Sequence, residues 1–97
     1  MPPPVFAIVI EAAEQVQREQ VQALVVENTG TWWHGMEDLW FVVGGHAGYW
    51  RDLLSPIFPT VQTGRVLVFK IDTSVPGSWA ARATFDETGL QWIEQNL

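Results

Sequence analysis

The chain has 97 residues, which is enough for one domain and no more. Hydrophobic residues make up 47% of it and charged residues 16%, so the composition excludes an intrinsically disordered protein. Five basic and eleven acidic residues leave a formal charge of −6, which disfavours a nucleic-acid partner because such binding depends on Lys and Arg. No apolar run approaches the roughly 18 residues of a membrane span, so we expect no membrane partner.

The first predicted elements are a strand and a helix. A continuous apolar run over Val5–Ile10 has the length of a buried strand. Residues 11–28 are rich in Ala, Glu, Gln and Arg, which favour a helix that Asn28 and Gly30 would end. Residues 1–4 lack the basic start of a secretory signal, and the chain has no cysteine. Both observations favour a cytoplasmic protein.

The middle of the chain reads as a hairpin followed by a second helix. Aromatic-rich runs over Thr31–His34 and Leu39–Val43 flank a polar turn at Gly35–Asp38, which is typical of a hairpin. A glycine-rich loop over residues 44–48 follows it. Apolar residues at helical spacing then predict a helix that Pro56 and Pro59 would end: Trp50, Leu53, Leu54 and Ile57.

The last part of the chain contains one more strand and one more helix. Arg65–Asp72 alternates and is predicted as a strand. Thr84 and Glu87 match a capping box and would open a short final helix. The face of that helix would carry Phe85, Gly89, Trp92 and Ile93.

The resulting order is β-α-β-β-α-β with a helix added at the end. This order predicts an α+β, ferredoxin-like fold, with a four-stranded antiparallel sheet and two helices on one face. We expect a single domain over residues 1–97, with a core over about 5–72 and a C-terminal extension over 73–97.

The sheet pattern also predicts a homodimer. The first and third strands are apolar on both faces, whereas two helices cover only one face of a four-stranded sheet. A second copy related by a twofold axis would cover the open face. The alternative is a monomer whose C-terminal helix folds across it. The predicted interface residues are Trp33, Val66 and Val68, the last two because their face of the fourth strand, shared with Lys70, is the less apolar one.

Four segments of the chain, Trp32-Trp33-His34, Leu39–Val42, Arg51–Pro56 and Arg65–Ile71, carry a family resemblance. They resemble SinR-like small bacterial proteins, ferredoxin-fold relatives of the VapD toxins and of the small CRISPR adaptation nuclease. The resemblance covers roughly residues 5–72 and implies a ferredoxin-like fold and a homodimer.

The same resemblance implies a candidate catalytic carboxylate. In the nuclease relatives an Asp at the end of the first strand is associated with metal-dependent cleavage, and Glu11 matches that position. Two Glu11 side chains across a dimer axis, or Glu11 with Asp72, would then hold Mg²⁺. The competing interpretation of Glu11 is a polar residue that simply follows a strand, and we favour it.

Two other segments are weaker candidates for a binding site, one for a metal ion and one for an anion. His34, Glu37 and Asp38 together have the ligand types of a metal site, although a solvated turn is the favoured interpretation. The glycine-rich loop with His46 precedes a helix and has the position of an anion site. It lacks the residues of a phosphate-binding loop, so a flexible connection is favoured.

The sequence therefore favours a homodimeric, non-catalytic binding or assembly module without a cofactor, and a protein partner is compatible with this prediction. One alternative is a Mg²⁺-dependent endoribonuclease or toxin of the VapD-like or CRISPR-adaptation type. Another is an acidic inhibitor that mimics nucleic acid.

Overall fold

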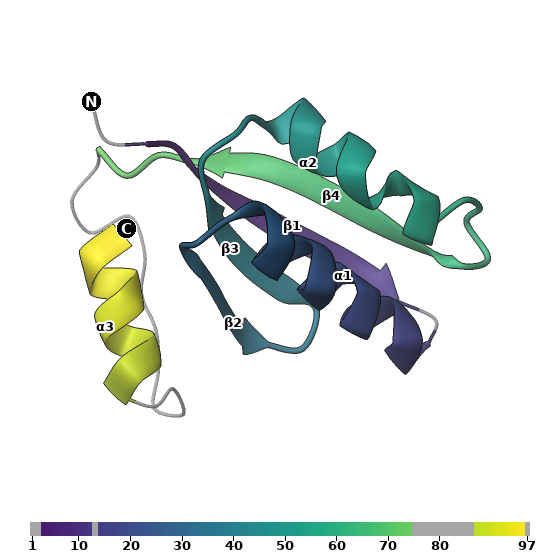
Figure 1. Ribbon diagram of the computed structural model, residues 1–97, viewed down its shortest axis with the longest axis horizontal. Coiled ribbons are helices and arrows are strands. Elements are labelled where there is room, and N and C mark those ends of the chain that lie inside the picture. Colours follow the sequence, from purple (N-terminus) through teal and green to yellow (C-terminus); the bar gives the residue numbers. More distant parts are fainter. Residues whose placement is uncertain (1–2, 13, 75–86, 97) are drawn as a thin grey trace.

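A four-stranded antiparallel sheet with the strand order β2-β3-β1-β4 forms the centre of the molecule (Figure 1). The computed structural model describes residues 3–12, 14–74 and 87–96. Its strands are β1 (Val5–Ala12), β2 (Trp32–Met36), β3 (Leu39–Val43) and β4 (Gly64–Ile71). Its helices are α1 (Gln15–Asn28), α2 (Ala47–Leu54) with a 3₁₀ turn η1 (Ser55–Ile57), and α3 (Glu87–Asn96). The predicted class, an α+β domain with an antiparallel sheet, is confirmed.

Several predicted boundaries move because tertiary pairing extends the strands. β1 runs on to Ala12, since its end pairs with the start of β4, and α1 consequently starts at Gln15 rather than Glu11. β2 continues through Gly35 to Met36, with a register irregularity between Trp33 and Met36. The hairpin turn shortens accordingly. The predicted capping residue Thr84 and the helix-face residue Phe85 lie outside the described residues.

α1 and α2 cover the same face of the sheet (Figure 1). The core between them and the sheet contains Phe6, Ile8, Ile10, Val21, Val25, Trp40, Val42, Trp50 and Leu54. Trp40 is fully buried, and its indole N–H donates to Gln22 Oε1 of α1 at 2.8 Å. Trp50 is also buried, and its N–H donates to the Gly44 carbonyl at 3.0 Å. Both large side chains thus contribute apolar area without leaving a buried donor unpaired.

The orientation predicted for β4 is wrong. Val66 and Val68 pack against the core on the helix side, opposite Ile10 and Ile8 of β1. Leu67 and Phe69 therefore point to the other face. α2 packs on β4 and contacts the side that carries the smaller Val side chains. This packing, and not the number of apolar residues on each side of the strand, therefore decides which side of β4 faces inward.

α3 approaches the sheet on the side away from α1 and α2. Its Trp92 ring stacks on Phe41 of β3 with 6.3 Å between ring centroids, and Phe41 stacks in turn on Trp33 of β2 at 5.0 Å. Ile93 is buried. The C-terminal helix thus covers the β2–β3 part of the second face. In the described part of the chain, no helix is both long enough and apolar enough to span a membrane.

The first testable prediction concerns Gly64, where β4 begins beside the end of β1. Gly64 has φ +121°, and a Cβ there would collide with the backbone carbonyl of Glu11 and touch the Phe58 ring. We expect Gly64→Ala to lower the free energy of unfolding by about 2 kcal/mol or more. Gly30→Ala is the matched control, because a Cβ at Gly30 meets no atom within 4 Å. Chemical denaturation of both variants checks this, and equal stabilities would contradict it.

Candidate functional site

The predicted interface residue Trp33 is buried within the chain itself. Only 7% of its surface is exposed, and it packs on Phe41 in the row that Trp92 of α3 extends. The predicted split of the Trp pair between two faces is confirmed, since Trp32 packs against the core under the helices. The β2–β3 part of the open face is therefore covered by α3.

The β1–β4 part of the same face presents apolar side chains to solvent. Leu67 is 61% exposed, Phe69 46% and Val9 36%. Val9 lies opposite Leu67, and Ala7 lies opposite Phe69, so the exposed side chains form one continuous patch. Leu67, Phe69 and Val9 are called the β4 patch below. The patch ends at the pair of opposed residues Glu11 and Arg65, whose side chains form an ion pair at 2.8 Å.

Glu11 and Asp72 do not come together within one chain. Glu11 lies opposite Arg65, whereas Asp72 follows the other end of β4, beyond the pairing of Val5 with Ile71. Seven residues of strand separate the two levels, a distance of about 23 Å. Asp72 instead accepts hydrogen bonds from the backbone and the hydroxyl of Ser74. A metal ion shared by these two carboxylates has no support in this geometry.

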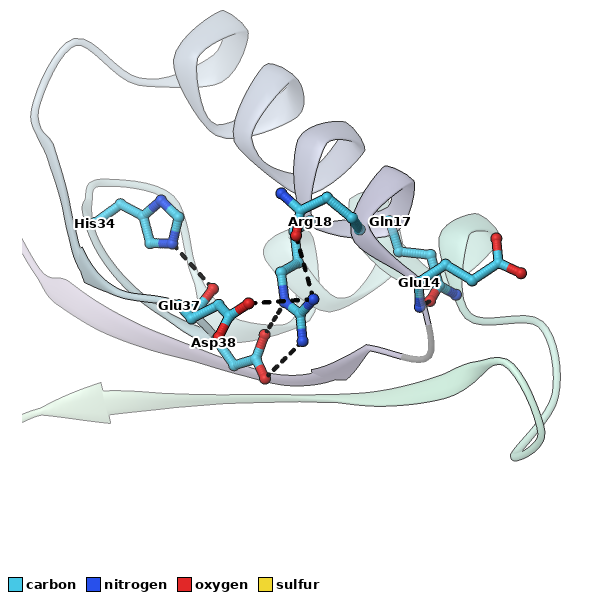
Figure 2. Close-up of polar contacts among 7 residues, drawn as sticks. Glu14, Gln17, Arg18, His34, Glu37 and Asp38 are labelled. Atoms are coloured by element: carbon cyan, nitrogen blue, oxygen red, sulfur yellow. Dashed lines mark hydrogen bonds and ion pairs between the residues drawn. The ribbon is translucent and has the colours of Figure 1, made fainter.

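The hairpin turn is tied to α1 by one arginine (Figure 2). Arg18 Nε donates to Asp38 Oδ1 at 2.6 Å, and its Nη1 lies 3.4 Å from Glu37 Oε1. The hydrogen bond to Asp38 is the main cause that raises the pKa of the Arg18 guanidinium above its usual value. This contact joins elements twenty positions apart in the sequence and fixes the hairpin against the helix layer.

The residues predicted as metal ligands, His34, Glu37 and Asp38, all make contacts within the fold. His34 Nε2 donates to the backbone carbonyl of Glu37 at 3.0 Å, and the imidazole stacks on Trp40 at 3.8 Å. This donation leaves Nδ1 as the ring nitrogen that could accept a proton or bind a metal ion. Within residues 3–12, 14–74 and 87–96, no three His, Asp or Glu side chains are grouped to hold a metal ion. The group formed by Arg18, His34, Glu37 and Asp38 is a structural connection.

Gln17 is a buried polar residue that the sequence pattern did not single out. Its side-chain amide donates to the carbonyls of Ile57 and Thr63, and its Oε1 accepts from the Glu14 backbone N–H at 2.9 Å. It therefore fastens the start of α1 to the segment that leads into β4. The only local signal was the Glu14-x-x-Gln17 spacing at the start of a helix, because the two carbonyls lie 40 and 46 positions away.

The His46 side chain caps the N-terminus of α2, so that end of the helix is not open to an anion. The His46 Nδ1 accepts a hydrogen bond from the Tyr49 backbone N–H at 3.1 Å. The Tyr49 hydroxyl reaches Asn28 Oδ1 at 2.9 Å, which connects this loop to the end of α1. The glycine-rich segment thus connects β3 to α2, and one backbone N–H at the start of α2 already has a partner. The flexibility expected of this connection stays a prediction.

Comparison with protein-family models, with curated proteins and with solved structures finds no match to this chain. The resemblance to SinR-like proteins therefore stays a prediction, and the function has to be inferred from the surfaces that the structure presents.

The second testable prediction concerns Gln17. Gln17→Leu leaves the carbonyls of Ile57 and Thr63 without this donor, and we expect it to lower the free energy of unfolding by about 1–3 kcal/mol. Gln20→Leu on the exposed side of the same helix is the control and should change stability by less than about 0.5 kcal/mol. Urea denaturation measures both, and a loss of similar size in the two variants would show that the contact has no special role.

The third testable prediction concerns the pH response of Asp72. The hydrogen bonds from the Ser74 hydroxyl and then from its backbone lower the pKa of Asp72 below its usual value. The stabilisation that this carboxylate contributes is therefore present at neutral pH and is lost as the pH falls through its lowered pKa. Ser74→Ala should move that pKa upward. Carboxyl ¹³C titration by NMR checks this, and an unchanged or lower pKa would contradict it.

Proposed function

We propose that this chain is a non-catalytic assembly module that acts as a homodimer, with the β4 patch as the contact between its two copies. The observation that carries the proposal is the exposure of Leu67, Phe69 and Val9 together on one sheet face. Contiguous exposed apolar side chains of this kind mark interaction sites on small proteins, because leaving them in water costs free energy that association recovers.

The charges around the β4 patch favour a second copy as its occupant. The chain carries a formal charge of −6, so two copies repel each other over most of their surface. At the end of the patch, however, Glu11 and Arg65 offer one charge of each sign. A twofold axis through the patch can place Arg65 of each copy near Glu11 of the other, which makes the surface self-complementary.

The proposal includes a ferredoxin-like arrangement of the domain. The support is the strand order β2-β3-β1-β4, in which α1 follows β1, α2 follows β3, and both helices lie on one face. In such a fold the second face of the sheet is left to other elements. Here α3 takes the β2–β3 part of it, and the proposed second copy takes the β1–β4 part.

The alternative of a metal-dependent nuclease has less support. The Glu11 side chain is engaged by Arg65, and Asp72 lies at the far end of β4. Of the predicted ligands, Glu11 from each of two copies remains, and two carboxylates do not complete the coordination of Mg²⁺.

The fourth testable prediction examines the proposed contact. Leu67→Glu places a charge in the centre of the β4 patch and should raise the dimer dissociation constant at least about thirtyfold, which corresponds to about 2 kcal/mol. Val26→Glu is the matched control, because Val26 of α1 is also an exposed apolar residue, 49% exposed against 61% for Leu67, and lies on the opposite side of the sheet. Sedimentation equilibrium over a concentration series measures both. A wild-type chain that stays monomeric at high concentration would overturn the proposal.

A further inference from the structure

The apolar surface on the second face of the sheet continues beyond the β4 patch. Val9 lies opposite Leu67 of β4 and also opposite Leu39 of β3, and Leu39 in turn lies opposite Met36 of β2. Directly opposed residues of antiparallel strands point to the same face, so these side chains form one row across all four strands. Met36, Leu39, Val9 and Leu67 are called the Met36 row below.

An irregularity in β2 turns Met36 toward this face. Trp33 and Met36 are three positions apart, so in a regular strand they would point to opposite sides. They pair instead with Phe41 and Leu39, which are two positions apart and share one side, and the register shifts between the two pairs. Trp33 is buried in the stack that Trp92 of α3 extends, whereas Met36, at the hairpin end of the strand, is 52% exposed.

The β4 patch alone is small for a contact between two copies. A stable dimer buries about 800 Å² on each partner, which is more than three partly exposed side chains provide. On one side the neighbouring surface is covered by α3, and at the end of the patch it stops at the ion pair of Glu11 with Arg65. The Met36 row is the apolar continuation between these two borders, and it extends about 14 Å from Leu67 to Met36.

Met36 is the residue of this row that an oxidant can change. The chain has two methionines, Met1 and Met36, and no cysteine, so it contains two sulfur atoms. A thioether is apolar, and its oxidation to the sulfoxide produces a polar group that is costly to bury without a hydrogen-bond partner. About half of the Met36 surface is open to solvent in a single copy, so a hydroperoxide can reach the side chain.

We propose that Met36 is an oxidation site that controls the homodimer, and this inference rests on the dimer proposed above. In the reduced chain the Met36 row packs against the same row of a second copy. In a free copy a hydroperoxide transfers its terminal oxygen to the Met36 sulfur. The O–O bond breaks, the sulfur loses two electrons as the S–O bond forms, and the other oxygen takes up the proton of the transferred hydroxyl and leaves as water or an alcohol. The sulfoxide weakens the contact in two places, because a twofold axis brings Met36 of both copies into it.

The experiment measures the dimer dissociation constant of the full chain by sedimentation equilibrium before and after treatment with hydrogen peroxide. Peptide mass spectrometry locates the added oxygen. We expect oxygen on Met36 and a dissociation constant raised at least about tenfold. Met36→Leu keeps an apolar side chain of similar volume without sulfur, so its dimer should form as in the wild-type chain and should not respond to peroxide. Met1→Leu is the matched control and should respond like the wild-type chain.

The possible outcomes separate the oxidation site from the homodimer itself. A wild-type chain that stays monomeric before treatment overturns the homodimer and this inference with it. A dissociation constant that is unchanged once Met36 carries oxygen, or a Met36 that peroxide does not oxidise, overturns the oxidation site alone. A loss of the far-ultraviolet circular dichroism signal on oxidation also overturns it, because peroxide would then act on the fold.

A second variant tests the polarity argument without an oxidant. Met36→Gln places a polar side chain of similar length in the row and should raise the dissociation constant at least about threefold. Gln at this exposed position is compatible with the folded chain, which circular dichroism checks. An unchanged dissociation constant would show that the contact does not reach Met36 and would contradict the proposal.

Discussion

The structure depends on a central strand, β1, that is apolar on both faces and is buried on both over its first four residues, 5–8. β1 has Phe6, Ile8 and Ile10 under the helices, while Val5 and Ala7 on the other face are also buried. It pairs with β3 on one side and with β4 along its whole length on the other. The backbone groups of β1 need hydrogen-bond partners along both of its edges, which β3 and β4 provide. Because the strand is apolar on both faces, each face also needs a covering layer.

The two covering layers differ in completeness. α1 and α2 close one face, and polar contacts set their positions: Gln17 reaches the segment before β4, and Arg18 reaches the hairpin. Among the residues that the structure describes, α3 covers the other face over β2 and β3, through the stack of Trp92 on Phe41. The rest of that face is formed by β4 and by Val9 of β1, which lies opposite Leu67. Within residues 3–12, 14–74 and 87–96, this incomplete second layer is the physical origin of the exposed patch.

β4 consequently has three different surroundings. Val66 and Val68 pack inward, Leu67 and Phe69 point to solvent, and the outer backbone edge faces away from β1. A central strand such as β1 has a partner strand on each side and therefore no free backbone edge. The proposed self-contact follows from this position at the border of the sheet, because Leu67 and Phe69 lie on the part of the second face that α3 does not cover.

The sequence by itself determined the order of the elements, the antiparallel α+β class and the split of Trp32 and Trp33 between two faces, because these follow from local periodicity. It did not determine which side of β4 faces inward, since Val66-Val68 and Leu67-Phe69 are both apolar rows and only contact with α2 separates them. It also left Gln17 unnoticed and gave no measure of the distance between Glu11 and Asp72. Those depend on partners 40 or more positions away and on strand register, which only the tertiary structure decides.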